Sequence, residues 1–144
     1  MGVGAMKTCT RRLEFDAGHR VLKHEGKCRH VHGHRYRVDI TVSAPELDAV
    51  GRVVDFSVIK DVVGTWLDDE MDHGYPHHPD DEFAVTLKEM GMKTFEMSTA
   101  YPNPTAENLC LLIASFAKDR LRDLTVESVR VYETPNCWAD WKRP

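Results

Sequence analysis

The sequence predicts an α+β fold in a single domain. Two long runs in its N-terminal third, residues 9–17 and 32–43, alternate apolar and polar side chains, as half-buried strands do. A polar loop over residues 23–30 separates the two runs, which favours an antiparallel hairpin over the crossover of a parallel sheet. Patterns with helical spacing follow later in the chain. The length of 144 residues is that of one domain.

The remaining elements follow from caps and periodicity. Asp55 is a good helix N-cap after a short strand end at residues 53–54. Either Asn103 or Thr105 caps a later amphipathic helix, because Pro104 suits a first helical turn. In chain order we expect a helix over 56–69, a loop over 72–80 with His77 and His78 at the surface, a helix over 81–90, a strand over 93–97, the helix that starts near 103–105, and a strand over 125–133.

Composition narrows the class of protein. Hydrophobic residues make up 42% and charged residues 29% of the chain, which excludes a disordered or fibrous protein. No apolar run approaches the roughly 18–20 residues of a membrane span, and no secretory signal is recognisable. The net charge of −4 differs from the basic charge that is typical of nucleic-acid-binding domains. We therefore expect a cytoplasmic protein with neither nucleic acid nor membrane as a partner.

The domain is expected to span residues 7–144, after a flexible leader of residues 1–6. A chain of this length needs no disulfide to hold its core. The four cysteines contain no CxxC pair and are interpreted as reduced thiols: Cys9, Cys28, Cys110 and Cys137.

Five of the eight histidines lie between His19 and His34. His32 and His34 share the face of their strand with the apolar side chains, and His19 continues the buried face of the first strand. If the two strands pair, three imidazoles meet at one end of the inward surface. Three neutral imidazoles with an open fourth position are typical of a catalytic zinc site. The alternative is that the three histidines are unrelated polar residues at strand ends.

Cys28 lies between Lys27 and Arg29 in the loop that joins the two strands. Neighbouring positive charge favours the thiolate, which can act as a base or a nucleophile. Two alternatives remain open from the residues alone. Cys28 could be an ordinary loop cysteine, or it could be the fourth ligand of a closed zinc site.

Two carboxylates also occupy informative positions. Asp72 directly precedes His73, and a carboxylate beside an imidazole can orient it for proton transfer. A solvated loop pair is the simpler interpretation. Glu133 shares the face of Val129 and Val131 at the end of a strand, so its charge points inward. An inward carboxylate either pairs within the protein or binds a ligand through N–H donors.

Taken together, these residues fall into motifs in a fixed order. The motifs are Phe15-Asp-Ala-Gly-His19, Cys28-Arg-His-Val-His32-Gly-His34, Val54-Asp55-Phe56, Asp72-His73, Pro104-Thr-Ala-Glu-Asn108 and Val131-Tyr-Glu-Thr134. In this order they resemble the 6-pyruvoyltetrahydropterin synthase / 6-carboxytetrahydropterin synthase family, from about residue 7 to residue 141. The three residues between Cys28 and His32 resemble the bacterial 6-carboxytetrahydropterin synthases of queuosine biosynthesis, whereas the animal pyruvoyl enzymes have a longer gap.

The resemblance implies a tunnelling (T-) fold, which is a four-stranded antiparallel sheet with helices packed on one face. It implies trimers that stack into a homohexamer. It also implies a zinc-dependent lyase that converts 7,8-dihydroneopterin triphosphate to 6-carboxy-5,6,7,8-tetrahydropterin, with release of acetaldehyde and triphosphate. The alternatives are a 6-pyruvoyltetrahydropterin synthase with the same substrate, or a zinc-stabilised pterin-binding oligomer without turnover.

The resemblance also implies roles for individual residues. Cys28 would abstract the proton, and His73, oriented by Asp72, would be the second acid or base. Zn²⁺ would be bound by His19, His32 and His34. The pterin would be anchored by Glu133 with Thr105 and Glu107 nearby, and Asp55 and Phe56 would reach the pterin of a neighbouring chain. Lys27, Arg29 and Arg20 are candidates for contacts to the triphosphate. The chain departs from the family pattern after His73 and has a longer segment over 76–94.

Overall fold

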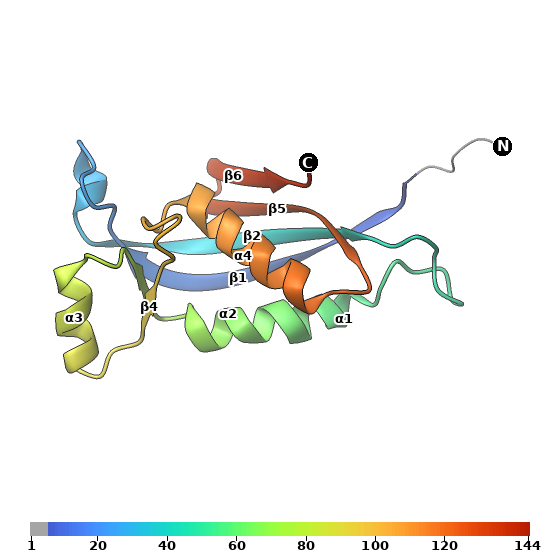
Figure 1. Ribbon diagram of the computed structural model, residues 1–144, viewed down its shortest axis with the longest axis horizontal. Coiled ribbons are helices and arrows are strands. Elements are labelled where there is room, and N and C mark those ends of the chain that lie inside the picture. Colours follow the sequence, from blue (N-terminus) through green and yellow to red (C-terminus); the bar gives the residue numbers. More distant parts are fainter. Residues whose placement is uncertain (1–5) are drawn as a thin grey trace.

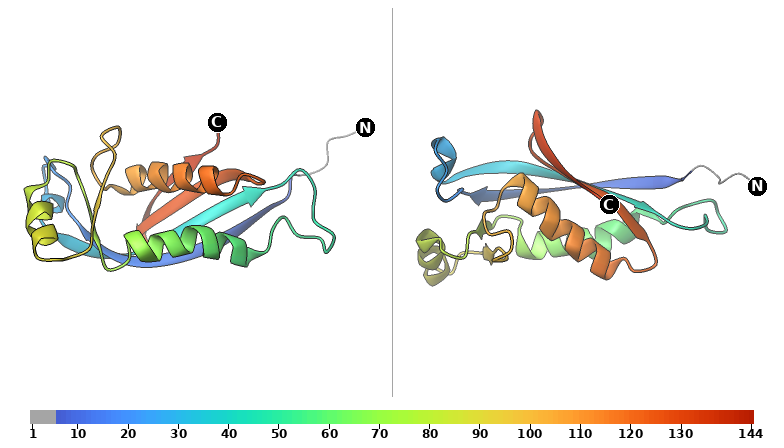
Figure 2. Two further views of the ribbon diagram at one scale, coloured as in Figure 1. Left: turned by 60° about the horizontal axis from the view of Figure 1, so that its bottom comes forward. Right: turned by 45° about the horizontal axis from the view of Figure 1, so that its top comes forward.

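The computed structural model describes residues 6–144. Its main sheet has four antiparallel strands. The strands and helices are β1 (Thr8–His19), β2 (His32–Ser43), α1 (Phe56–Ile59), α2 (Thr65–Glu70), β3 (Tyr75–His77), α3 (Glu82–Glu89), β4 (Thr94–Glu96), α4 (Ala106–Arg120), β5 (Thr125–Thr134) and β6 (Cys137–Lys142). The helices α1, α2 and α4 cover one face of this sheet (Figures 1 and 2). The expected α+β class is therefore confirmed.

The order of strands in the main sheet is β1-β2-β5-β6. β1 and β2 form the expected hairpin, in register from Thr8 opposite Ser43 to His19 opposite His32. Because side chains alternate along a strand, this register gives His19 the same face as Phe15 and Ala17. That face is buried, since Phe15 is fully enclosed and Ala17 is 6% exposed.

The core lies between the sheet and the helices. Its centre consists of apolar side chains from three strands and three helical segments, all fully buried: Phe15, Tyr36, Val38, Ile40, Ile59, Val63, Leu109, Ile113, Val129 and Val131. The opposite face of the sheet carries charged pairs, such as Arg12 with Asp39 and Arg130 with Asp140. The alternation read from the sequence thus assigned the inward and outward faces correctly.

The helix expected over 56–69 runs from residue 56 to residue 70 and contains a π-helical turn, η2 (Lys60–Gly64), between α1 and α2. Its predicted cap is confirmed, because the Asp55 side chain accepts a hydrogen bond from the backbone N–H of Ser57. Thr105 is the cap of α4 and accepts from the N–H of Asn108. The residues expected to end a short strand, 53–54, are irregular.

The segment after α2 differs most from expectation. Residues 72–80 are not all loop, because β3 pairs with β4 in a separate two-stranded parallel sheet. The strand expected over 93–97 is therefore β4, which lies outside the main sheet. His77 was expected at the surface, but it is 8% exposed and its ring stacks on Tyr75. Three-residue strands are too short to give a recognisable alternation.

β6 was not predicted and supplies the fourth strand of the main sheet. Its residues Ala139 and Trp141 pack against the core from the edge of the sheet. Within residues 6–144, no helix is long and apolar enough to cross a membrane. All four cysteines are free, and burial raises the pKa of the Cys110 thiol to about 11. The expected leader lies outside the described residues, apart from Met6.

Candidate functional site

Three histidines meet where the β1–β2 hairpin ends. Each offers one ring nitrogen to a common point, and the three nitrogens lie within 4.8 Å of one another. His19 and His32 are opposite each other in the ladder, and their Nε2 atoms are 3.1 Å apart. The convergence expected from strand parity for His19, His32 and His34 is therefore confirmed.

Hydrogen bonds fix the orientation of two of these rings. His19 donates from Nδ1 to the carbonyl oxygen of Pro104 at 2.8 Å, and His32 donates from Nδ1 to the carbonyl oxygen of His30 at 2.8 Å. A neutral imidazole has only one N–H, so both Nε2 atoms are left as acceptors that face each other. The Nε2 atom of His34 is buried and has no hydrogen-bond partner. Such a set of lone pairs fits a metal cation and fits no pairing among the rings themselves.

Burial favours the neutral form of His19 and His34. His19 is 1% exposed, and burial lowers its pKa to about 4, with His32 and His34 acting in the same direction. Burial also lowers the pKa of His34. Neutral imidazole is the form that binds a metal. His19 and His34 can therefore bind a metal ion at neutral pH without first losing protons.

Glu133 lies beside this cluster. One of its carboxylate oxygens is 3.9 Å from Nε2 of His34, and the Glu133 side chain is 28% exposed. Burial is the main cause that raises the pKa of Tyr36, and the negative charge of Glu133 raises that pKa further. The Glu133 side chain lies on the same side of the sheet as His34, as expected, and it is only partly buried. Glu133 can thus accept N–H donors from a ligand next to the metal site.

Cys28 lies in the short 3₁₀ helix η1 (Lys27–Arg29), within the loop between β1 and β2. Its thiol is free and half-buried. Its carbonyl oxygen accepts a hydrogen bond of 2.9 Å from the N–H of Val21, only two residues after His19. The backbone of Cys28 is therefore tied to the chain that leaves the histidine cluster.

Asp72 and His73 lie on the free edge of β1. The Asp72 carboxylate accepts from the N–H of Asp16 at 2.9 Å, and the N–H of His73 donates to the carbonyl oxygen of Asp16 at 2.7 Å. His73 has a φ of +60°, and its side chain is 78% exposed with Nε2 3.8 Å from Asp72. Gly74 follows, where a Cβ would lie 2.9 Å from the carbonyl oxygen of Met71.

Asp72 and His73 thus form a pair, as expected, but His73 contributes no atom to the histidine cluster. His73 and His34 both line one shallow depression. In this chain alone, the imidazole of His73 is presented outward.

Thr105 and Glu107 lie at the start of α4, as its N-cap and in its first turn. Thr105 follows Pro104, whose carbonyl oxygen orients His19. Glu107 is exposed in the first turn of the helix. Thr105 is therefore next in the chain to a contact of the candidate metal site, although its hydroxyl already serves as the helix cap.

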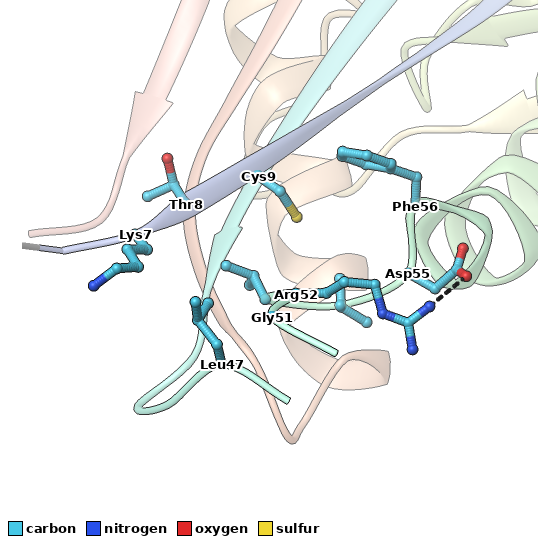
Figure 3. Close-up of a pocket in the computed structure, with 10 residues that line it drawn as sticks. Lys7, Thr8, Cys9, Leu47, Gly51, Arg52, Asp55 and Phe56 are labelled. Carbon is cyan, nitrogen blue, oxygen red and sulfur yellow. Dashed lines mark hydrogen bonds and ion pairs between the residues drawn. The ribbon is translucent and has the colours of Figure 1, made fainter. Parts of the chain in front are cut away.

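Asp55 and Phe56 lie at the other end of the molecule. They line an open hollow of about 410 Å³ with Thr8 and Cys9 from the start of β1 (Figure 3). Phe56 is 51% exposed, and Asp55 forms an ion pair with Arg52. The twelve residues of β1 separate this hollow from His19 by roughly 36 Å. Asp55 and Phe56 therefore cannot contact the histidine cluster of their own chain.

Sequence reasoning missed two contacts, the one between Tyr36 and His19 and the pairing of Arg20 with Asp81. The Tyr36 hydroxyl lies 3.1 Å from Nδ1 of His19, and its position was readable from the parity of β2. The Arg20 guanidinium is paired with Asp81, which is 2% exposed and also accepts from the Tyr75 hydroxyl at 2.7 Å. No sequence signal joins Arg20 to Asp81, because the two are 61 positions apart.

The sequence of the whole chain has close relatives. A family model described as 6-pyruvoyl tetrahydropterin synthase matches residues 8–144. A protein from Rickettsia conorii named 6-carboxy-5,6,7,8-tetrahydropterin synthase is 40% identical over 140 residues, which cover 94% of this chain and 99% of that protein.

Solved structures share the fold. An uncharacterized protein from Wolinella succinogenes matches with a TM-score of 0.83 at 20% identity, over 98% of this chain and 100% of that chain. The 6-pyruvoyl tetrahydropterin synthase of Caenorhabditis elegans matches with a TM-score of 0.70 at 24% identity, over the full length of both chains. The four-stranded sheet with helices on one face is thus the tunnelling fold, as expected. With the family model matched from β1 to the C-terminus, the chain belongs to the 6-pyruvoyl tetrahydropterin synthase family.

Proposed function

We propose that the protein is a zinc-dependent carbon–carbon lyase that converts 7,8-dihydroneopterin triphosphate to 6-carboxy-5,6,7,8-tetrahydropterin, acetaldehyde and triphosphate. The observation that carries this proposal is the cluster of three converging imidazoles, in which the buried Nε2 of His34 has no hydrogen-bond partner, next to the Glu133 carboxylate. The name of the Rickettsia relative and the three-residue gap between Cys28 and His32 favour the carboxy product over the pyruvoyl product. The product is a precursor in queuosine biosynthesis in the relatives that the motifs resemble.

His19, His32 and His34 would hold the zinc ion, because neutral imidazoles are its preferred nitrogen ligands. When bound, zinc supplies a Lewis acid that polarises side-chain oxygens of the substrate and so makes the neighbouring C–H more acidic. The hydrogen bonds from His19 to Pro104 and from His32 to His30 hold both rings in the tautomer that presents Nε2.

In this proposal the protons are moved by residues of the chain. Cys28 removes the proton from the substrate side chain as a thiolate, with Lys27 and Arg29 as flanking positive charges. His73 gives and takes protons on the other side of the substrate, and Asp72 orients it. Because the His73 ring is exposed at the edge of β1, it is available to a substrate held by a neighbouring chain.

Glu133 would anchor the pterin, since its two oxygens match a ring N–H beside an exocyclic amine. Thr105 and Glu107 would complete the pterin site. Lys27 and Arg29 are the better candidates for the triphosphate, because Arg20 is already paired with Asp81.

The separation of Asp55 and Phe56 from the cluster supports an oligomer. If these residues contact the same pterin as Glu133, they do so from another chain, given roughly 36 Å between the two ends of β1. The sheet also ends in two edge strands, β1 and β6, and edge strands are commonly covered by pairing. We propose a homohexamer made of two trimers.

Product analysis tests the proposed reaction. Zinc-loaded protein is incubated with 7,8-dihydroneopterin triphosphate, and acetaldehyde and the pterin are identified by mass spectrometry. Acetaldehyde in equal amount to 6-carboxy-5,6,7,8-tetrahydropterin is the expected result. A 6-pyruvoyl product without acetaldehyde would assign the other synthase activity, and binding without turnover would leave only a pterin-binding oligomer.

A further inference from the structure

The Asn103 side chain forms a two-point contact with the loop that carries Cys28. Its Oδ1 accepts from the N–H of Leu22 at 3.0 Å, and its Nδ2 donates to the carbonyl oxygen of Leu22 at 3.2 Å. Both backbone polar groups of Leu22 are thus paired with one side chain from a segment 81 positions away. Only a carboxamide can donate and accept at once in this way, because a carboxylate has no donor.

Asn103 is itself fixed to the start of α4. Its carbonyl oxygen accepts from Nδ2 of Asn108 at 2.8 Å and from the N–H of Thr105 at 2.9 Å. The next residue, Pro104, provides the carbonyl oxygen that orients His19. The turn at Asn103 and Pro104 therefore touches two functional elements at once, the metal ligand His19 and the loop after it.

The contact at Leu22 leads directly to Cys28. Leu22 follows Val21, whose N–H donates to the carbonyl oxygen of Cys28 at 2.9 Å. Asn103 is thus hydrogen-bonded to Leu22, and the preceding residue, Val21, is hydrogen-bonded to Cys28. The loop lies outside the main sheet, so its position relative to the cluster depends on side-chain contacts of this kind.

We propose that Asn103 is a positioning residue for Cys28, and that its carboxamide sets the place of the thiol relative to the metal ligands. This proposal rests on the proposed role of Cys28 as the base. Asn103 contacts Leu22 rather than substrate, so its removal affects the reacting geometry more than substrate binding. A displaced base costs turnover, because the rate depends steeply on the distance between the reacting groups.

The kinetic test compares Asn103→Asp with Asn103→Ala in the zinc-loaded protein. We expect both variants to lose about tenfold in kcat, with KM within about twofold of the parent and an unchanged zinc content. Asp forms turns and caps as well as Asn does. If Asn103 only shaped the turn before α4, Asn103→Asp would keep the parent kcat, and that result would overturn the proposal. Should Asn103→Ala fail to fold, Asn103→Asp still decides.

Asn136 provides the matched control. It is an exposed asparagine in the turn between β5 and β6, where its N–H donates to the hydroxyl of Thr134. Asn136→Asp is expected to keep the parent kcat and KM. An equal loss in Asn136→Asp and Asn103→Asp would mean that the effect is a general one on stability, which contradicts the proposal.

A second test does not depend on turnover. The rate of alkylation by iodoacetamide is measured separately for Cys28 and for the exposed Cys137 by peptide mass spectrometry. Cys28 is half-buried. Asn103→Asp loses the hydrogen bond from Nδ2 to the carbonyl oxygen of Leu22 and places a carboxylate oxygen against that carbonyl, so release of the loop should raise the alkylation rate of Cys28 about tenfold. The rate at Cys137 should not change.

An unchanged alkylation rate at Cys28 would refute the proposal that Asn103 positions the loop, whatever the catalytic role of the thiol. Conversely, full turnover in Cys28→Ala would refute the proposed base and leave the alkylation result intact. The failure of the positioning role and the failure of the proposed function are therefore distinguishable.

Discussion

The two ends of β1 differ in what they offer a ligand. At its C-terminal end, His19 is buried and oriented by the carbonyl oxygen of Pro104, and ring nitrogens from three histidines converge on one point. At its N-terminal end, Thr8 and Cys9 line an open hollow beside the half-exposed ring of Phe56. The C-terminal end offers imidazole nitrogens that can bind a metal ion, and the N-terminal end offers an accessible surface on which an aromatic ring can pack. A site that uses both ends needs two chains.

The largest effect is expected from removing the metal ligands. The double variant His32→Ala/His34→Ala should lose the bound zinc and all measurable turnover, because one imidazole alone does not hold the ion. Elemental analysis of the purified protein checks this. His30→Ala is the matched control, since the His30 side chain is exposed and only its carbonyl oxygen contacts His32. Full zinc content in the double variant would refute the metal site.

Cys28→Ala, near the C-terminal end of β1, should reduce the rate of the reaction without reducing the binding of zinc or pterin. We expect zinc content and pterin affinity to stay as in the parent, while kcat falls about 10²–10⁴-fold, as is typical when a general base is removed. Steady-state kinetics and elemental analysis give both values, with Cys137→Ala as the control. Loss of zinc in Cys28→Ala would instead make Cys28 a fourth ligand.

Mixing two inactive variants tests whether the two ends act from different chains. Phe56→Asp places a charge in the apolar hollow and should inactivate the protein, and Cys28→Ala inactivates the other end. Oligomers assembled from equal amounts of both variants should regain about a quarter of the parent activity, because each site then draws its two halves at random. Activity that stays at the level of the separate variants, in mixed oligomers of parent size, would contradict a shared site.

Glu133→Gln should weaken pterin binding without changing the zinc content. It replaces one acceptor oxygen by a donor, so a charge-assisted pair worth about 1.5–3 kcal/mol is lost and the pterin Kd rises roughly 10–150-fold. Calorimetric titration with a pterin product measures the change. Glu127→Gln is the control on the same strand, where Glu127 is paired with Ser43 and Arg143. Equal affinity for Glu133→Gln and the parent would place the pterin anchor elsewhere.

The smallest effect concerns the link between β1 and the segment after Asp72. Burial raises the pKa of Asp81, but hydrogen bonds from Arg20 and Tyr75 outweigh burial and hold that pKa below its usual range. A carboxyl with a lowered pKa in the folded chain stabilises the fold above the unfolded-state pKa of about 3.9. This contribution disappears as the pH falls through the folded-state pKa.

Asp81→Asn should therefore lower the free energy of unfolding by about 2 kcal/mol at pH 7, and the difference from the parent should shrink below about pH 4. Urea unfolding across this pH range provides the measurement. Asp80→Asn is the matched control, because the neighbouring Asp80 side chain is 87% exposed. A difference that stays constant down to pH 3 would mean that the Asp81 charge does not contribute.

The parts of the site that sequence could predict are those that a strand arranges. Parity brought His19, His32 and His34 to one face, and a hairpin with a short loop brought their strands together. The same reasoning placed Glu133 on the inward face. These predictions needed only local geometry, which the period of two along a strand supplies.

The remaining parts depend on contacts between distant segments. The Asn103 contact with Leu22 and the pairing of Arg20 with Asp81 leave no local pattern. β6 was missed although Ala139 and Trp141 alternate with polar residues, because the run is short and lies at the edge of the sheet. The placement of β4 beside β3 likewise depends on tertiary pairing rather than on its own three residues.

The register of the hairpin also bears on the order in which the chain folds. His19 and His32 are only 13 positions apart, so bringing them together closes a short loop at a small entropic cost. Contacts between β2 and β5, such as the one from Ser43 to Glu127, span 84 positions and form slowly by comparison. A nascent hairpin can therefore present all three proposed metal ligands, His19, His32 and His34, before Glu133 arrives on β5. Zinc in the refolding buffer should then accelerate refolding, and not merely stabilise the finished protein.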